Sequence, residues 1–355
     1  MSVFRLMYLL FATMCRRPIV RYLIFVAGVL VVAMPLRAER IEPPLELLHD
    51  PVNLLVVGKA VEINTTASRI VFECKTILAG NRSYVTQDLI DTRVPAEALA
   101  RVVVGDNYIF GYSLFSEDPR RPGKLIGKRQ GATMLVSPGV EPALFADTPE
   151  VRKLLDAGGS EHSRESRSTL KLLVATLKSK DPALQNLAAN QLALEPDLQA
   201  RFKPEDRGAI EEFVRDPHTP ALARTPLLEA AAQHPEAFGP DWALDTTKSL
   251  LSTTPVDGFS DRTSDLETLL RVAFSLSGES SRGLPEASLV RWVRSNSVVL
   301  AEPALRLLHQ TYPQAERQAV EGALQDSATP QQTKDFLRGY LQRMNGEHRA
   351  VHSGQ

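Results

Sequence analysis

Two patterns of apolar and polar positions divide this chain. From Asn53 to Phe145 apolar residues form short runs or alternate with polar ones, with Gly and Asn between the runs, which is typical of β-strands. This pattern predicts five strands, at 53–63, 69–78, 84–90, 108–115 and 132–136, and a short helical turn at 95–99. Five strands with one helix between the third and the fourth is the element order of a small closed barrel.

After Thr148 the period changes to that of helices. Leu170, Leu173, Val174 and Leu177 follow the spacing that lines one helix face, and similar stripes recur along the chain. About ten to twelve helices are expected between 149 and 344. Four pairs place a cap residue before a proline at the first helical position: Thr148 with Pro149, Asp181 with Pro182, Thr219 with Pro220, and Thr329 with Pro330.

The helical stripes also repeat as pairs. Residues 173–192, LVATLKSKDPALQNLAANQL, resemble the HEAT repeat, in which two helices flank an Asp-Pro turn. A second copy spans 213–231, with Asp216 lying 35 residues after Asp181, and weaker copies occupy 297–308 and 326–341. The first copy has Gln185 where the family has arginine, and the polar stretches 252–263 and 275–285 are longer than ordinary turns. The resemblance implies an α-solenoid, whose stacked pairs bury a continuous core.

The β-rich half has a resemblance of its own. Residues 55–61, 72–80, 105–110 and 142–145 are similar to secreted OB-type barrels of the netrin/TIMP-like class. Members of that class often carry disulfides, and in the metalloprotease inhibitors an amino-terminal cysteine binds zinc. This sequence has neither feature, so the resemblance implies the fold and not inhibitor chemistry.

The predicted fold class is therefore α+β and multidomain, a small OB-like β-barrel followed by a HEAT-like all-α solenoid. The boundaries that follow are 1–38 for a signal peptide or amino-terminal anchor, 39–147 for the barrel, 148–345 for the helical repeats and 346–355 for a disordered tail.

The amino-terminal segment predicts export. Arg16, Arg17 and Arg21 precede an apolar run at 22–34 that is shorter than the ~20 residues of a membrane-spanning helix. Cleavage after Ala38 would give a periplasmic or extracellular protein, whereas an uncleaved segment 19–36 would serve as an anchor. Met14 is an alternative start to Met1.

Net charge and cysteine content exclude some classes of partner and an internal disulfide. Without residues 1–38 the chain keeps 36 basic and 42 acidic residues, a net charge of about −6, which argues against nonspecific binding to nucleic acid or anionic membranes. Of the two cysteines only Cys74 remains, so no internal disulfide is expected. Its strand-like apolar surroundings predict a core thiol.

No catalytic or cofactor motif is found. The seven histidines are scattered without metal-ligand spacing, and His234 and His309 are expected at helix ends, where they meet the negative end of the helix dipole. The G-x-S-x-G, P-loop and G-x-G-x-x-G patterns do not occur. We therefore expect no catalytic residues, no metal site and no cofactor.

The most concentrated charge lies between the fourth and fifth predicted strands. With the tyrosines at 84, 108 and 112 this basic loop could bind an anionic polymer by charge and stacking, or it is a plain solvated hairpin loop. Its basic residues are Arg120, Arg121, Lys124, Lys128 and Arg129.

Three functions are compatible with these patterns. The first is a non-enzymatic scaffold or adaptor of a bacterial-type cell envelope, whose helical repeats meet a protein partner. The second is a module that binds an anionic polymer or glycan through the barrel and its basic loop. The third is an extracytoplasmic enzyme whose site is assembled from residues far apart in the sequence.

Overall fold

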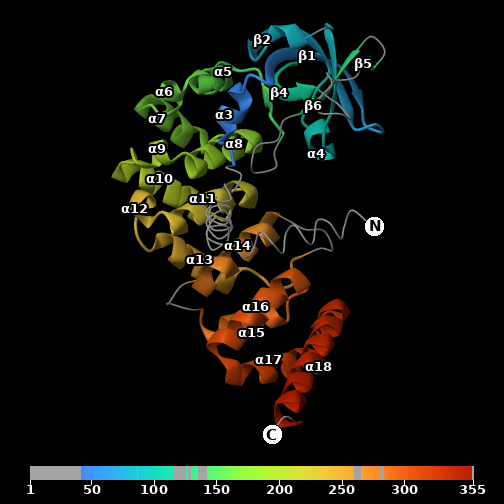
Figure 1. The fold of residues 1–355 in the computed structure, drawn as a ribbon, viewed down its shortest axis with the longest axis vertical. Coiled ribbons are helices and arrows are strands. Elements are labelled where there is room, and N and C mark those ends of the chain that lie inside the picture. Colours follow the sequence, from blue (N-terminus) through green and yellow to red (C-terminus); the bar gives the residue numbers. More distant parts are fainter. Residues whose placement is uncertain are drawn as a thin grey trace, which may run out of the picture. The chain divides into compact units, whose positions relative to one another are not determined.

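The structure is a computed structural model that describes residues 41–85, 87–114, 125–126, 129–134, 142–259, 265–279 and 284–353. The predicted export segment and Met14 lie outside these ranges. A closed five-strand barrel occupies the amino-terminal half of the chain, and helices occupy the carboxy-terminal half (Figure 1). The predicted α+β class is confirmed at this level.

The barrel closes through one parallel pairing. Its strands follow each other around the barrel in the order β1, β2, β3, β6 and β4, and β4 pairs again with β1. The β3–β6 pair is parallel and the other four pairs are antiparallel. The five strands and the helix between the third and fourth are β1 (Leu54–Asn64), β2 (Arg69–Ala79), β3 (Leu89–Arg93), α4 (Ala96–Leu99), β4 (Asn107–Leu114) and β6 (Arg129–Met134).

The prediction misplaced the third strand. A 3-10 turn, η1, spans Arg82–Tyr84 and ends at the residue where the third strand was expected to begin, and β3 starts five residues later than predicted. The Asn81 side chain accepts a hydrogen bond from the Ser83 amide and so favours this turn. Two short strands were missed, β5 (Leu125–Ile126), which pairs with β6, and β7 (Leu144–Ala146), which pairs with β4.

Strand β1 is buried on both faces over its first half. Leu54 and Val56 belong to the interior of the barrel, whereas Leu55 and Val57 pack among residues of the helices. This double burial explains the unbroken Leu-Leu-Val-Val run, since one-sided strands alternate with polar residues. The barrel wall and the first helices consequently share one hydrophobic cluster.

Helices from α5 onward fill the rest of the chain, with α3 before the barrel. Ten of the later helices pack as the pairs described below: α7 (Arg167–Thr176), α8 (Pro182–Leu194), α10 (Pro204–Arg215), α11 (Ala221–Gln233), α13 (Trp242–Thr253), α14 (Asp265–Glu279), α15 (Glu286–Val293), α16 (Val298–Thr311), α17 (Pro313–Gln325) and α18 (Gln331–Ser353). The others are α3 (Pro44–His49), α5 (Pro149–Asp156), η2 (Ala157–Gly159), α6 (Glu161–Arg164), α9 (Pro196–Gln199) and α12 (Pro235–Phe238). The described residues thus hold slightly more helices than expected, because α6, α9 and α12 are extra single turns.

The long helices pack as successive pairs: α7 with α8, α10 with α11, α13 with α14, α15 with α16, and α17 with α18. The second helix of each pair contacts the second helix of the next, from α8 through α11, α14 and α16 to α18. Leu187 in α8 is buried. The last helix continues to Ser353, into the segment where we predicted a disordered tail.

Two of the four predicted caps are confirmed. Thr148 accepts a hydrogen bond from the Val151 amide at the start of α5, and Asp181 accepts one from the Ala183 amide at the start of α8. The other two are wrong, because α11 and α18 begin after Pro220 and Pro330 rather than at them. Asp216 and Asp326 instead order the turns before these helices: the side chain of each accepts a hydrogen bond from the amide two residues on, and its carbonyl accepts one from the amide of Thr219 or Thr329.

The polar stretch after α13 is held by the following helix pair. Arg291 and Trp292 of α15 donate to the carbonyl of Leu251, at 2.7 and 2.6 Å, and Arg291 also donates to Thr254 at 2.9 Å. Asn296 accepts a hydrogen bond from the Phe259 amide at 3.1 Å. The described part of this stretch, which interrupts the repeat pattern in the sequence, therefore joins the α13–α14 pair to the α15–α16 pair.

Candidate functional site

The structure describes one of the five basic residues predicted as an anion site. Arg129 lies in β6, where it forms ion pairs with Glu62 at 2.6 Å and Asp91 at 3.9 Å. Asp91 also accepts a hydrogen bond from Arg69 at 2.8 Å, so its charge is shared by two arginines. Arg120, Arg121, Lys124 and Lys128 lie outside the described residues.

Two of the three tyrosines proposed to stack with a ligand lie inside the barrel. Tyr108 and Tyr112 are buried and pack with Phe72 and Phe110, whose rings stack at 4.2 Å between centroids. Burial raises the pKa of the Tyr112 hydroxyl. These rings therefore offer no face to a polymer, and Tyr84's side chain lies outside the described residues.

Cys74 contacts the interior of the barrel from a half-buried position. Burial, followed by the charge of Asp88, raises the pKa of its thiol. A thiol with a raised pKa is a poor nucleophile at neutral pH, since the thiolate is the reactive form. The geometry agrees with a packing role for Cys74.

The two histidines predicted at helix ends are in those places. His234 follows the last residue of α11, and its amide donates to the carbonyl of Ala230. His309 lies in the last turn of α16, and its Nδ1 atom is 2.9 Å from a carboxylate oxygen of Glu316. The buried Glu316 side chain also accepts a hydrogen bond from Tyr340, so the three side chains connect α16, α17 and α18.

Neither of the two pockets described below is lined by His309, Glu316 or Tyr340. Among the described residues there is also no group of three or more His, Cys, Asp or Glu side chains placed to hold a metal ion.

A groove of about 560 Å³ crosses three consecutive second helices, α11, α14 and α16. Val272 and Leu276 of α14 and Val299 and Pro303 of α16 are its apolar residues, and Val299 is 46% exposed. This volume lies in the range of ligand-binding clefts. We name this feature the second-helix groove.

Charged side chains of both signs line the second-helix groove. They are Glu229 of α11, Arg271 of α14, and Glu302 and Arg306 of α16. Within the part of the chain that the structure describes, none of the four forms an ion pair or a side-chain hydrogen bond. Four solvated charges beside the exposed Val299 can pair with complementary charges of a bound segment.

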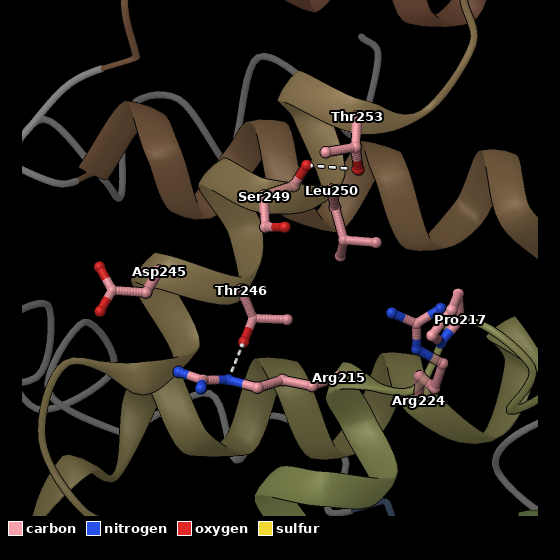
Figure 2. A pocket seen from close by; sticks show the side chains of 8 residues that line it. All are labelled: Arg215, Pro217, Arg224, Asp245, Thr246, Ser249, Leu250 and Thr253. Atoms are coloured by element: carbon pink, nitrogen blue, oxygen red, sulfur yellow. Dashed lines mark hydrogen bonds between the residues drawn. The ribbon is translucent and has the colours of Figure 1, made fainter.

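A second pocket, of about 550 Å³, lies where the end of α10 and the start of α11 meet α13 (Figure 2). Its lining residues are Arg215, Pro217, Arg224, Asp245, Thr246, Ser249, Leu250 and Thr253. Figure 2 shows Arg224 beside Pro217 at one side of the pocket and Asp245 at the other. We name this feature the Arg224 pocket.

The two arginines of the Arg224 pocket differ in their surroundings. Arg215 is exposed, forms an ion pair with Glu211 at 3.0 Å, and donates through Nε to the Thr246 hydroxyl at 3.3 Å. Arg224 is only 4% exposed, and burial lowers the pKa of its guanidinium group. Its Nε atom donates to the carbonyl of Val214 at 2.7 Å, which is its one hydrogen bond to the described residues.

Arg224 and Gln185 have the same role in their helix pairs. Gln185 of α8 donates to the carbonyl of Leu177 at the end of α7, as Arg224 of α11 does to Val214 at the end of α10. In the α10–α11 pair an arginine therefore makes the hydrogen bond that a glutamine makes in the α7–α8 pair. Arg224, which follows the Asp-Pro turn of the second copy, is the sequence signal of this pocket that the prediction missed.

Comparison with known proteins does not extend this picture: no protein-family model, no curated protein and no solved structure matches the chain. Among the described helices, none combines the length and the apolar character required to cross a membrane.

Proposed function

We propose that this chain is an exported, non-enzymatic protein-interaction scaffold of a cell envelope, and that it binds a partner protein in the second-helix groove. The groove carries the proposal, because it joins three successive helix pairs into one surface with the exposed Val299 and unpaired charges. Solenoids use such extended surfaces for binding.

The folds that we propose fit this role. The order of the second helices, each in contact with the next, supports a HEAT-like solenoid. The five-strand closure through a parallel β3–β6 pair, with α4 between β3 and β4, supports an OB-type barrel. The arginine-led apolar run before Ala38 supports export.

The partner segment should carry charges of both signs around an apolar residue. Glu229 and Glu302 favour a basic side chain of the partner, whereas Arg271 and Arg306 favour an acidic one. Val299 and Pro303 offer the apolar contact between them. A polymer that carries only negative charge would meet two carboxylates, which disfavours it as the occupant.

Site-specific crosslinking in the source cells tests this proposal. A photoreactive phenylalanine analogue replaces Val299 in the groove or, as a control, the exposed Val52 beside the barrel. We expect a discrete crosslinked protein from position 299 and none of the same mass from position 52. The double variant Arg271→Glu and Arg306→Glu should reduce this product roughly tenfold, since each charge pair contributes about 1 kcal/mol or more when desolvated.

A matched charge reversal separates the groove from net charge. Lys153→Glu combined with Lys178→Glu changes the total charge equally on exposed residues outside the groove and should leave the crosslink unchanged. Equal crosslinking from position 299 in the wild-type background, the double arginine variant and the double lysine variant would contradict the proposal. So would the absence of any product from position 299. Mass spectrometry of the amino terminus in the envelope fraction tests export: a start at Glu39 indicates cleavage, and an intact segment 19–36 indicates an anchor.

A further inference from the structure

The Arg224 pocket contains a buried cation without an anionic partner. At 4% exposure Arg224 is removed from most of its water, yet the part of the chain that is described gives it no carboxylate within ion-pair distance. Asp216 is near enough to affect it only through space. Desolvating a charge is costly unless a partner of opposite charge compensates, so such a group favours an incoming anion.

Geometry restricts what this anion can be. The Nε edge of the guanidinium is occupied by the Val214 carbonyl, so its end, formed by the two Nη atoms, remains for a ligand. Two parallel N–H groups match the two oxygens of a carboxylate. An arginine held by its backbone contact is also ordered before the ligand arrives, which reduces the entropy lost on binding.

The rest of the pocket supports a small, singly charged ligand. Thr246 already accepts a hydrogen bond from Arg215 and retains its own hydroxyl proton, and Ser249 adds a second hydroxyl group on α13. The Thr253 hydroxyl donates to the carbonyl of Ser249 at 2.8 Å, so its proton is not available to the ligand (Figure 2). Arg215 is compensated by Glu211, and Asp245 adds a negative charge at the far side. A dianionic phosphate or a polyanion would therefore be less well matched than a carboxylate.

We propose that the Arg224 pocket binds a carboxylate group, held end-on by the Nη atoms of Arg224 and by hydroxyl groups of α13, with Leu250 and Pro217 against its apolar part. The carboxylate belongs either to a free organic acid or to an acidic side chain or chain end of a peptide. This site is separate from the second-helix groove and does not depend on it.

Nuclear magnetic resonance of the arginine side chains in the full protein tests the site. Sodium acetate, a blocked glutamate-containing tripeptide and inorganic phosphate are titrated separately, and the Arg224 Nε signal is assigned by its loss in a variant. We expect acetate or the peptide to shift this signal saturably, and phosphate to bind at least tenfold more weakly. Saturation by both carboxylates indicates a free acid as a sufficient ligand, and saturation by the peptide alone indicates a peptide source.

Arg224→Gln is the informative variant, because Gln185 shows that glutamine can make the same backbone contact at the end of the preceding helix. It should keep its cooperative thermal unfolding and bind the carboxylate at least tenfold more weakly. Arg207→Gln is the matched control on α10, outside the pocket, and should bind normally. If Arg224→Gln does not fold, the test uses Ser249→Ala, which should bind the carboxylate more weakly than the wild type in the same titration.

Unchanged carboxylate binding in Arg224→Gln would overturn the proposal. So would the absence of a saturable shift with either carboxylate, or tighter binding of phosphate than of acetate.

Discussion

The Nε2 atom of His49 lies 2.8 Å from the carbonyl oxygen of Leu155 and connects α3, the helix before the barrel, with the end of α5. The carbonyl can only accept, so the Nε2 atom carries the proton in this contact. Gly158 leaves the space for the ring, since a Cβ atom at that position would lie 2.6 Å from His49 Cδ2. A second contact runs parallel to it, from the Leu45 amide to Gln191 of α8 at 2.8 Å.

His49 should make stability depend on pH. Burial holds the pKa of His49 below its ordinary value of 6.5, although its hydrogen bond to Leu155 acts in the opposite direction. The unfolded chain therefore binds a proton at a higher pH than the folded chain does. The free energy of unfolding is therefore unaffected by His49 titration above pH 6.5. It decreases as pH falls from 6.5 toward the lower pKa of the folded state, and His49 causes no further change below that pKa.

Urea unfolding at pH 7.5 and pH 5 measures this dependence. His49→Gln removes the titrating group and retains an N–H donor for Leu155, so its stability should change less between the two pH values than that of the wild type. An equal change in both proteins would show that other groups cause the pH dependence.

Gly58→Ala should destabilise the barrel. A Cβ atom there would lie 2.9 Å from Phe110 Cε1 and 3.1 Å from Phe72 Cβ, within the stacked pair of the interior. Overpacking of this kind costs about 1–3 kcal/mol, measured by chemical denaturation. Gly208→Ala in α10 is the control: it meets no atom within 4 Å and should stabilise the protein by about 0.5–1 kcal/mol.

Leu187→Ala should lower the free energy of unfolding of the helical half. Leu187 is 2% exposed and belongs to the cluster that α8 shares with its neighbouring helices and the barrel wall. The lost contacts and the cavity together cost about 2–5 kcal/mol in denaturant unfolding. Leu187→Arg should prevent folding, as judged by circular dichroism, and a folded Arg variant would contradict the core position; Lys171→Ala, exposed on α7, should stay within about 0.5 kcal/mol of the wild type.

Glu316 should couple the last three helices energetically. Its buried carboxylate accepts hydrogen bonds from Tyr340 of α18 and from His309 of α16. Glu316→Ala should cost about 1–3 kcal/mol of unfolding free energy, because two helices lose their shared acceptor. In a double-mutant cycle with Tyr340→Phe we expect a coupling energy of about 0.5–3 kcal/mol, whereas simple additivity would argue against a direct link.

Prediction from sequence succeeded where the cause is local. The stripe from Leu170 to Leu177 indicated a helix, and Leu170, Leu173 and Leu177 are buried. Thr148 and Asp181 cap their helices through amides two or three residues away. The third strand failed for an equally local reason, since the turn at Asn81 competes with the apolar pattern that follows.

The candidate sites could not be derived in the same way. The Arg224 pocket joins residues from Arg215 to Thr253, and the second-helix groove joins residues from Glu229 to Arg306. Neither set has a characteristic spacing, because turns and helix stacking set the distances within it. The basic loop was predicted as an anion site from its density of positive charge. Its described member, Arg129, instead forms ion pairs with acidic residues on other strands.

The sequence alone predicted the order of the five barrel strands and the helix between them, the first two helix pairs and export, because periodicity, capping and an apolar run depend on neighbouring residues. The tertiary structure decided how the barrel closes, why β1 is apolar on both faces, and which polar residues meet in a pocket. These features depend on pairings between distant segments, in which long-range packing outweighs local preference. Arg224 illustrates the difference: its place after a turn is visible in the sequence, but its burial without an anionic partner is a property of three helices together.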